Sequence, residues 1–166
     1  MANQSVLVAD ADLSLTITRA FDAPREAVFE AWIDPRQIAS WLGPRGVRME
    51  CTEMQPWPGG SFRMVARDAA GNQNIVGGVF KEVTSPARLV FTWAWENRAD
   101  TAGDTLVTVT FVAIGTRTEV TLRHEGFPTE DFRSRHQNGW NASFDNLAEI
   151  LAGHVVVRGG DGALCA

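Results

Sequence analysis

The sequence predicts an α+β fold in which one antiparallel sheet curves around a long C-terminal helix. Six or seven segments alternate apolar and polar residues with period two and are joined by hairpin-length turns, as is typical of a meandering antiparallel sheet. The segment 129–151 instead repeats its apolar residues at helical spacing. A sheet with one apolar face must bury that face, and this helix is the only predicted element long enough to cover it.

The first predicted strand covers residues 13–21, where LSLTITRAF alternates with period two. A helix is predicted next in DAPREAVFEAWI, with Asp22 or Ala23 as its N-cap and Pro24 in its first turn. Apolar residues recur along this helix at the spacing of one buried face. They are Val28, Phe29, Trp32 and Ile33.

A sharp corner separates this helix from a second short helix in AWIDPRQIASWLGP. Pro35 has no backbone N–H and disfavours helix at the residue before it, so the first helix ends there and Asp34 caps the second. Gly43 suits the left-handed residue that terminates a helix. We expect Trp32 and Trp41 to pack inward at this corner, beside the long helix, in a structural role.

Six strands are predicted between residues 47 and 125. Gly77 and Gly78 interrupt one of them, QNIVGGVFKEV, and indicate either a bulge or a close approach of two backbones. QPWPGG, RDAAGN and the polar loop ENRADTAGD are interpreted as connections. The alternation places two pairs of large residues on inward strand faces. These pairs are Phe62 with Met64 and Phe91 with Trp93.

The last predicted element is the helix over residues 129–151. Thr129 is expected to cap its start, and Gly153 is expected to stop it. Residues at successive i, i+4 positions form one ridge on its inward face. The ridge consists of His136, Trp140 and Phe144.

Length and composition predict a single domain over residues 1–166, with its core at about 13–152 and a tail, 153–166, that is expected to fray. The net charge of -5 argues against a nucleic acid or an anionic membrane as a partner. No apolar run approaches the ~20 residues of a membrane span, and the N-terminal segment lacks the features of a secretory signal. Cys51 and Cys165 are not expected to form a disulfide, which fits a soluble cytoplasmic protein.

Five segments resemble the activator-of-Hsp90-ATPase-homologue-1-like branch of the START/Bet v 1-like (SRPBCC) superfamily. They are FDAPREAVFEAWIDPRQIASWLGP, GGSF, GGVFKEVTSPARLVFTW, TLVTVTF and HEGFPTEDFRSRHQNGWNASFDNLAEIL, and together they span about residues 13–151. The resemblance implies a helix-grip fold: a seven-stranded antiparallel sheet curved around a C-terminal helix, often with a cavity between them. The superfamily includes lipid carriers, hormone receptors, polyketide cyclases and co-chaperone domains, so the resemblance leaves the function open.

No pattern in the sequence predicts a metal or a cofactor. The histidines, His124, His136 and His154, lack the spacing of metal ligands, and no P-loop, dinucleotide motif or nucleophile elbow is present. His124 and Glu125 are neighbours on a strand and point to opposite faces, which argues against an acid–base pair. His136 is either a hydrogen-bonded core histidine or a residue of a ligand pocket.

These observations predict a cavity between the sheet and the long helix. Its predicted ligand-binding residues are Phe62, Met64, Phe91, Trp93, His136, Trp140 and Phe144. Aromatic side chains between a curved sheet and a helix suit a small apolar or amphipathic molecule. Trp57, between two prolines, lies either at the mouth of this cavity or in a surface turn.

The favoured hypothesis is therefore a protein that binds a small hydrophobic molecule, because the sequence contains no catalytic constellation. One alternative is an enzyme of the polyketide cyclase/aromatase or hydrolase type, which needs a titratable group within hydrogen-bond reach of its substrate. The other is an interaction domain similar to Hsp90-activating co-chaperones, which needs an exposed patch outside the cavity. A homodimer and a chaperone partner stay open.

Overall fold

The computed structural model describes residues 13–96 and 103–153. The expectations for the N-terminal segment, the tail beyond Gly153, His154, Cys165 and the middle of the polar loop lie outside these residues. The described elements, in chain order, are β1 (Ser14–Phe21), α2 (Arg25–Ile33), α3 (Pro35–Trp41), β2 (Arg48–Met54), β3 (Ser61–Arg67), β4 (Gln73–Thr84), β5 (Arg88–Trp95), β6 (Thr105–Ile114), β7 (Arg117–Glu125) and α4 (Glu130–Leu151).

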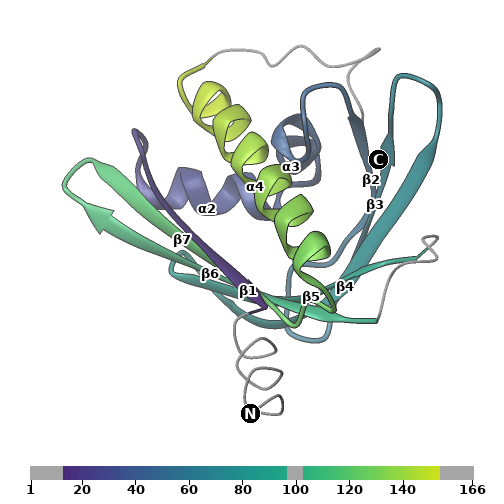
Figure 1. Ribbon diagram of the computed structural model, residues 1–166. Helices are drawn as coiled ribbons and strands as arrows, with labels where there is room; N and C mark the ends of the chain where they lie inside the picture. Colours follow the sequence, from purple (N-terminus) through teal and green to yellow (C-terminus); the bar gives the residue numbers. More distant parts are fainter. Residues whose placement is uncertain (1–12, 97–102, 154–166) are drawn as a thin grey trace.

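The strands form one seven-stranded sheet in the order β1-β7-β6-β5-β4-β3-β2, and every neighbouring pair is antiparallel. The sheet is strongly curved, and α4 lies within its concave side, while α2 and α3 lie beside the C-terminal half of α4 (Figure 1). This arrangement confirms the predicted helix-grip fold. The predicted inward strand faces are confirmed as well, because Phe62, Met64, Phe91 and Trp93 are all buried.

The corner between α2 and α3 has the predicted chemistry. The Asp34 carboxylate accepts hydrogen bonds from the backbone N–H groups of Arg36 and Gln37 at 2.9 and 3.3 Å, so it caps α3. Trp32 and Trp41 are buried side by side, with ring centroids 4.8 Å apart in a T-shaped arrangement. Their predicted structural role at the corner is confirmed.

The predicted cap of α2 is wrong. Pro24, and not Asp22 or Ala23, is the N-cap, with an extended backbone and no side-chain hydrogen bond to the helix. The Pro24 carbonyl already accepts from the N–H groups of Ala27 and Val28 at 3.0 and 3.1 Å. Pro24 therefore precedes the helix, which begins at Arg25, and does not lie in its first turn.

Gly77 and Gly78 mark a close approach of backbones, which was one of the two predicted alternatives. A Cβ atom on Gly78 would lie 1.8 Å from the Thr92 carbonyl oxygen of the neighbouring strand, far inside contact distance. The irregularity in the β4–β5 register lies instead between Phe80 and Glu82. The bulge alternative is therefore wrong at the two glycines: Gly78 lets β4 approach β5, and Gly77, where a Cβ would lie 2.9 Å from the Phe62 carbonyl oxygen, lets β4 approach β3.

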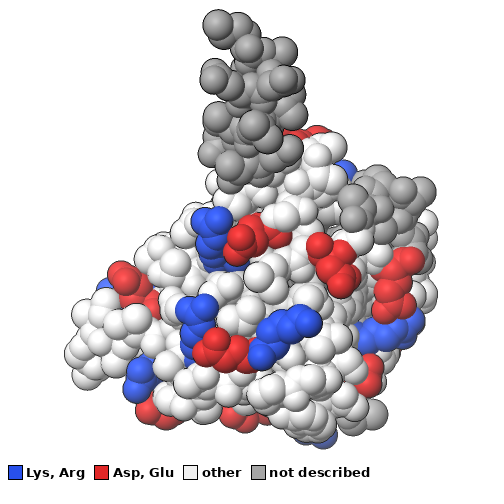
Figure 2. Space-filling view, turned by 90° about the horizontal axis from the view of Figure 1, so that it is seen from below, with Lys and Arg blue, Asp and Glu red and all other residues white. Residues whose placement is uncertain are grey.

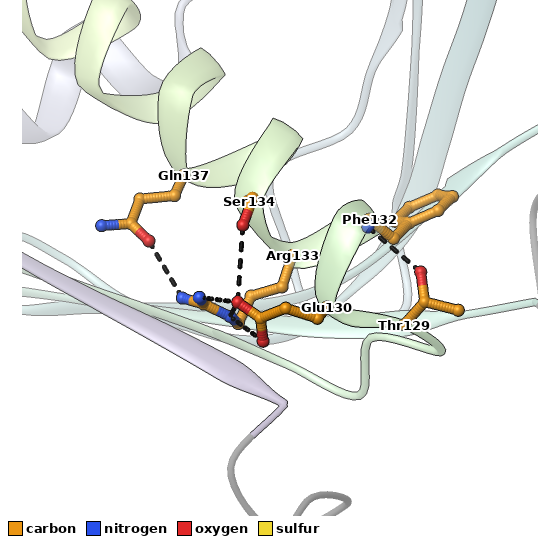
Figure 3. A network of polar contacts seen from close by, with 6 residues as sticks. All are labelled: Thr129, Glu130, Phe132, Arg133, Ser134 and Gln137. Atoms are coloured by element: carbon orange, nitrogen blue, oxygen red, sulfur yellow. Dashed lines mark hydrogen bonds and ion pairs between the residues drawn. The ribbon is translucent and has the colours of Figure 1, made fainter.

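The start of α4 shows how the sequence specifies its longest helix. Thr129 accepts a hydrogen bond from the Phe132 N–H at 3.1 Å, which confirms the predicted cap (Figure 3). Within the first turns, Arg133 pairs with Glu130 and donates to the Gln137 side chain at 2.9 Å. At the other end Gly153 has a positive φ of 87°, as expected for the residue that stops a helix.

The face of the molecule seen from below carries charges of both signs. Figure 2 shows basic and acidic side chains next to one another on this face, over its described residues. The ion pairs Arg63–Glu96, Arg88–Glu82 and Arg123–Glu125 join exposed side chains. Such pairs contribute little to stability, so we treat them as solvated surface. Within the described ranges, the helices are too short or too polar to cross a bilayer.

Candidate functional site

A cavity of about 240 Å³ lies between α4, the strands β2 to β5 and the segment that joins α3 to β2. Most of its wall is apolar and aromatic: Leu42, Pro44, Val47, Met49, Ala66, Trp93, Trp95 and Trp140. A smaller polar part consists of Asp68, Asn74, Arg135, His136 and Ser143. An apolar wall with a few polar groups is the usual composition of a small-molecule site.

The structure brings three of the seven predicted residues to this cavity. They are Trp93, His136 and Trp140. Phe62, Met64 and Phe91 lie deeper, around a separate void of about 20 Å³ that Trp93 and Trp140 also line. The ligand-binding roles of all these residues stay predictions.

Phe144 is placed differently, although it is on the same helical ridge as Trp140. Its ring packs against those of Phe21 and Trp32, with centroids 5.6 and 6.0 Å away. Phe144 is fully buried and does not line the cavity or the smaller void. The predicted lining is therefore wrong for this residue, because β1 and α2 close over the C-terminal half of α4.

Gly139 is a cavity residue that the sequence analysis missed. It lies in the middle of α4, where glycine is unfavourable by roughly 1 kcal/mol relative to alanine. A Cβ atom built on Gly139 would meet nothing within 4 Å. Since no packing contact forbids a side chain there, this glycine widens the cavity. A glycine beside Trp140 on an otherwise regular helix was the signal available in the sequence.

His124 anchors the helix wall of the cavity from behind. The indole N–H of Trp140 donates to His124 Nδ1 at 3.0 Å, and an indole nitrogen can only donate. His124 Nδ1 is therefore unprotonated, and its Nε2–H donates to the Thr105 hydroxyl at 2.6 Å. That hydroxyl donates in turn to the Trp93 carbonyl at 2.7 Å. The chain of bonds joins the α4 wall to β5 through a neutral histidine.

Burial lowers the pKa of His124 well below its usual value, and the charge of nearby His136 lowers it further. The His124 side chain is completely buried, and its ring centroid lies 5.4 Å from that of His136. A charged imidazolium at this position would lose its acceptor role toward Trp140 and would lack water. His124 therefore stays neutral in the folded protein at neutral pH.

His136 holds a tryptophan of the sheet wall in place, as His124 holds Trp140 of the helix wall. The Trp95 indole N–H donates to His136 Nε2 at 2.9 Å, and His136 Nδ1 contacts the Phe132 carbonyl, one turn earlier in α4, at 2.8 Å. Both alternatives considered from the sequence therefore describe His136 in part, because it is hydrogen-bonded and it also lines the cavity. With both ring nitrogens engaged, its geometry favours holding Trp95 in place over transferring a proton.

Trp93 differs from the other two cavity tryptophans. Trp93 is only 7% exposed, and its Nε1 has no hydrogen-bond partner among the described residues. Trp32 has an unpaired, buried Nε1 as well, but Trp32 lines only the small inner void. Trp93 is thus the one indole of the cavity wall whose N–H is not committed to a histidine.

Comparison with known protein families identifies the family of this chain. The sequence profile described as "Activator of Hsp90 ATPase homolog 1-like protein" matches residues 22–152. The chain belongs to this family. The resemblance seen in the sequence is therefore confirmed, and so is the START/Bet v 1-like class of the fold.

Solved structures agree with this assignment. A protein from Chromobacterium violaceum is 27% identical, with a TM-score of 0.79 over 83% of this chain and 96% of its own. The Activator of Hsp90 ATPase homolog 1 protein from Silicibacter pomeroyi is 25% identical, with a TM-score of 0.75 over 84% and 97%. A protein from Arthrobacter aurescens, at 22% identity and a TM-score of 0.78 over 86% and 88%, shares the fold. A comparison with curated proteins finds no match.

In this member of the Activator of Hsp90 ATPase homolog 1-like family, the polar part of the cavity carries both signs of charge. A side-chain hydrogen bond from Asn72, at 3.0 Å, lowers the pKa of the exposed Asp68. Arg135, on the opposite wall, pairs with Asp131 at 3.1 Å. The polar part of the cavity therefore has a carboxylate just after β3 and a guanidinium on α4. Trp57 is 55% exposed and does not line the cavity, which leaves the surface-turn alternative.

The described residues contain no group of three or more His, Cys, Asp or Glu side chains arranged to hold a metal ion. The two closest histidines, His124 and His136, use their nitrogens for the tryptophans and the protein backbone or hydroxyl groups. The expectation that this family member needs no metal or cofactor stays a prediction.

Proposed function

We propose that this protein binds a small apolar or amphipathic molecule in the cavity between α4 and the sheet. The observation that carries the proposal is Gly139, which opens the middle of α4 toward an apolar cavity of about 240 Å³. The glycine weakens the helix and relieves no clash, so its effect is to leave room for a ligand. The helix-grip fold of the family, which commonly binds ligands, supports the same function.

Binding is favoured over catalysis by the state of the titratable groups. Acid–base chemistry requires a group that can exchange a proton with the substrate. The nitrogens of His136 are engaged with Trp95 and Phe132, and Asp68 is exposed at the rim with backbone and Asn72 hydrogen bonds. These contacts hold walls and turns in place, as a binding site requires.

The test compares Gly139→Leu with Asn138→Leu. The first variant places four carbons in the cavity from a position where a Cβ meets nothing. The second adds the same side chain at the adjacent, exposed position of α4, so it controls for helix propensity and added hydrophobicity. Native mass spectrometry of freshly purified protein, followed by a thermal-shift screen of fatty acids, aromatics and polyketides, supplies the candidate ligands.

A ligand present at 100 times its Kd should stabilise the wild-type protein by roughly 2.7 kcal/mol. The same shift is expected for Asn138→Leu, and the shift should be lost in Gly139→Leu. If the ligand stabilises Gly139→Leu as much as the wild type, it binds elsewhere and the proposal is wrong. If no compound stabilises any of the three proteins, the interaction-domain alternative becomes the better hypothesis.

A further inference from the structure

We propose that Asn74 selects the ligand of this cavity, and that the ligand carries one polar group that both donates and accepts a hydrogen bond, as a lactam or a carboxamide does. This inference rests on the proposed function and names the chemistry of the ligand's polar group. It combines the position of Asn74 on the sheet with the hydrogen bonds of the other polar residues in the cavity wall.

Asn74 lies on the concave face of the sheet. It is the second residue of β4 and pairs with Ala66 of β3, which pairs in turn with Met49 of β2. All three residues line the cavity, and Ala66 and Met49 are buried. Val76, two residues further along β4, points to the same face and is completely buried in the core. The amide of Asn74 therefore stands on a part of the sheet wall that is otherwise apolar.

The side-chain amide of Asn74 is accessible to a ligand. It makes no hydrogen bond to another described residue, and Asn74 is half-buried. Neither its nitrogen nor its oxygen is sealed off inside the protein, whereas the Nε1 of Trp93 is. Because the amide is attached directly to the Cβ, it stays on the face to which the Cβ points. A molecule in the cavity can therefore reach it.

The other polar side chains of the cavity wall are already used within the protein. Ser143 is bonded to backbone groups of α4 and of the α3–β2 segment at 2.8 and 2.7 Å. Asp68 accepts three hydrogen bonds within the β3–β4 turn, at 2.9 to 3.0 Å. Arg135 forms an ion pair along α4, and His136 is bonded through both ring nitrogens. These contacts fix the wall, which leaves the amide of Asn74 for recognition.

The chemistry of an amide sets what the ligand must offer. The NH₂ group of Asn74 donates and its carbonyl oxygen accepts. A ligand that displaces water from both groups, but carries only an acceptor, leaves the Asn74 oxygen unpaired. Leaving a desolvated polar group unpaired costs more than one hydrogen bond adds. A donor and an acceptor side by side on the ligand satisfy both groups.

A role in solvation alone is the competing explanation. Asn74 is close to the β3–β4 turn, where Asp68 is exposed. Water alone can satisfy an amide at such a rim. In that case, removing the amide would leave the preference among ligands unchanged, and this difference is what the experiment measures.

The test uses indane, 2-indanone and oxindole, which share one bicyclic frame. They carry no polar group, an acceptor, and an acceptor with an adjacent donor, respectively. A cavity of about 150 Å³ is known to hold benzene, so a bicycle suits the cavity of about 240 Å³. Their Kd values are measured by calorimetry for the wild type, Asn74→Leu and Asn74→Asp. The control is Gln73→Met, which removes an amide from the exposed, neighbouring position of β4.

Ratios of Kd values are compared between proteins, which cancels the different hydrophobicity of the probes. The preference for oxindole over indane should fall at least about 5-fold in Asn74→Leu, the lower end for two hydrogen bonds, and should stay unchanged in Gln73→Met. Asn74→Asp keeps an acceptor and loses the donor. It should abolish the preference for 2-indanone over indane and retain part of the preference for oxindole, whose N–H donates to the carboxylate.

A second measurement needs no variant and covers the case in which the Asn74 variants do not fold. In ¹⁵N-resolved NMR spectra of the wild-type protein, a side-chain NH₂ resonance of Asn74 should move downfield with 2-indanone and oxindole and not with indane. The NH₂ group of Asn72, which does not line the cavity, is the reference and should respond alike to all three probes.

The outcomes separate this inference from the proposed function. If the probes bind in a Gly139-dependent way but the ratios are the same in Asn74→Leu and the Asn74 resonances do not discriminate, the inference is overturned and the binding function stands. If Asn74→Asp weakens 2-indanone and oxindole equally, the ligand's donor is not recognised by Asn74. If Gly139-dependent binding is found only for compounds without a donor–acceptor group, the inference is overturned as well. If nothing in the wider screen binds, both proposals fail together.

Discussion

Five of the six tryptophans form two groups that differ in their surroundings: Trp32 and Trp41 at the α2–α3 corner, and Trp93, Trp95 and Trp140 at the cavity. At the corner, Trp32 and Trp41 pack edge to face, and the Trp41 N–H donates to the Ala31 carbonyl at 2.9 Å. At the cavity, the N–H groups of Trp95 and Trp140 are held by histidines. The two groups meet where the Trp32 ring stacks on Trp140, with centroids 5.9 Å apart.

The difference shows that residue type alone does not decide whether an aromatic side chain packs in the core or lines a cavity. At the corner, Trp32 and Trp41 pack against each other, and Trp32 also contacts Phe111 of β6 and Phe144 of α4, so both indoles are core side chains. At the cavity, the walls that face α4 are strands β2 to β5 and the segment that joins α3 to β2, and Gly139 removes a side chain from α4 itself. There, histidines accept the N–H groups of Trp95 and Trp140, whereas at the corner Trp41 donates to a backbone carbonyl.

The largest expected effect is a loss of stability in Trp41→Ala. Trp41 is fully buried, and truncating a buried aromatic side chain typically costs about 3–5 kcal/mol. Urea denaturation should therefore show a much lower free energy of unfolding. Trp57→Ala is the control, because this side chain is 55% exposed and should change stability by less than about 0.5 kcal/mol. Equal losses in the two variants would contradict a closed, packed corner.

The next largest effect is a dependence of the free energy of unfolding on pH that comes from His124. Because the folded-state pKa of His124 lies well below the usual histidine value of 6.5, the unfolded chain binds more protons than the folded protein as the pH falls through 6.5. The free energy of unfolding should therefore decrease on acidification below about pH 7, with a slope from this one group of at most about 1.4 kcal/mol per pH unit. Denaturation curves from pH 8 to pH 5 measure this slope.

The control for the pH effect is His124→Gln. Its amide oxygen can accept from Trp140 and its NH₂ can donate to Thr105, but it does not titrate. The slope should be smaller in this variant than in the wild type. An unchanged slope would mean that His124 is not the neutral link between α4 and β5.

A smaller loss is expected for Asp34→Ala at the corner. The carboxylate caps α3 through two backbone N–H groups, and losing such a cap costs about 1 kcal/mol. Asp34→Asn, which keeps an acceptor oxygen, should recover most of this loss in the same denaturation experiment. If Asp34→Ala is as stable as the wild type, packing of the tryptophans holds the corner without its cap.

The smallest effect is a gain in stability. Gly139→Ala should stabilise the protein by about 0.5–1 kcal/mol, since alanine is the better helix former and a Cβ meets nothing within 4 Å. Asn138→Ala on the exposed face of α4 provides a reference for helix propensity alone. A loss of stability in Gly139→Ala would show that the cavity wall is closer to this glycine than the geometry indicates.

The elements of this fold were predictable because their signals are local. Asp34 before Pro35 and Thr129 three residues before the Phe132 N–H each act within one helical turn, and both caps were confirmed. Alternation in β3 and β5 likewise identified the buried faces. The Pro24 cap was missed because the same local residues allow a start at several neighbouring positions.

The site depended on distances that the sequence does not contain. From the sequence, His124 was considered as a metal ligand and as a partner of its neighbour Glu125, whereas the β6–β7 and β1–β7 pairings turn it toward α4, where it meets Trp140. Trp140 and Phe144 share one ridge, yet one faces the cavity and the other the closed core. A helical repeat specifies which side of α4 is apolar. Packing between elements remote in the chain sets the distance between that side and the curved sheet at each helical turn. This distance decides whether a residue on α4 packs in the core or lines the cavity.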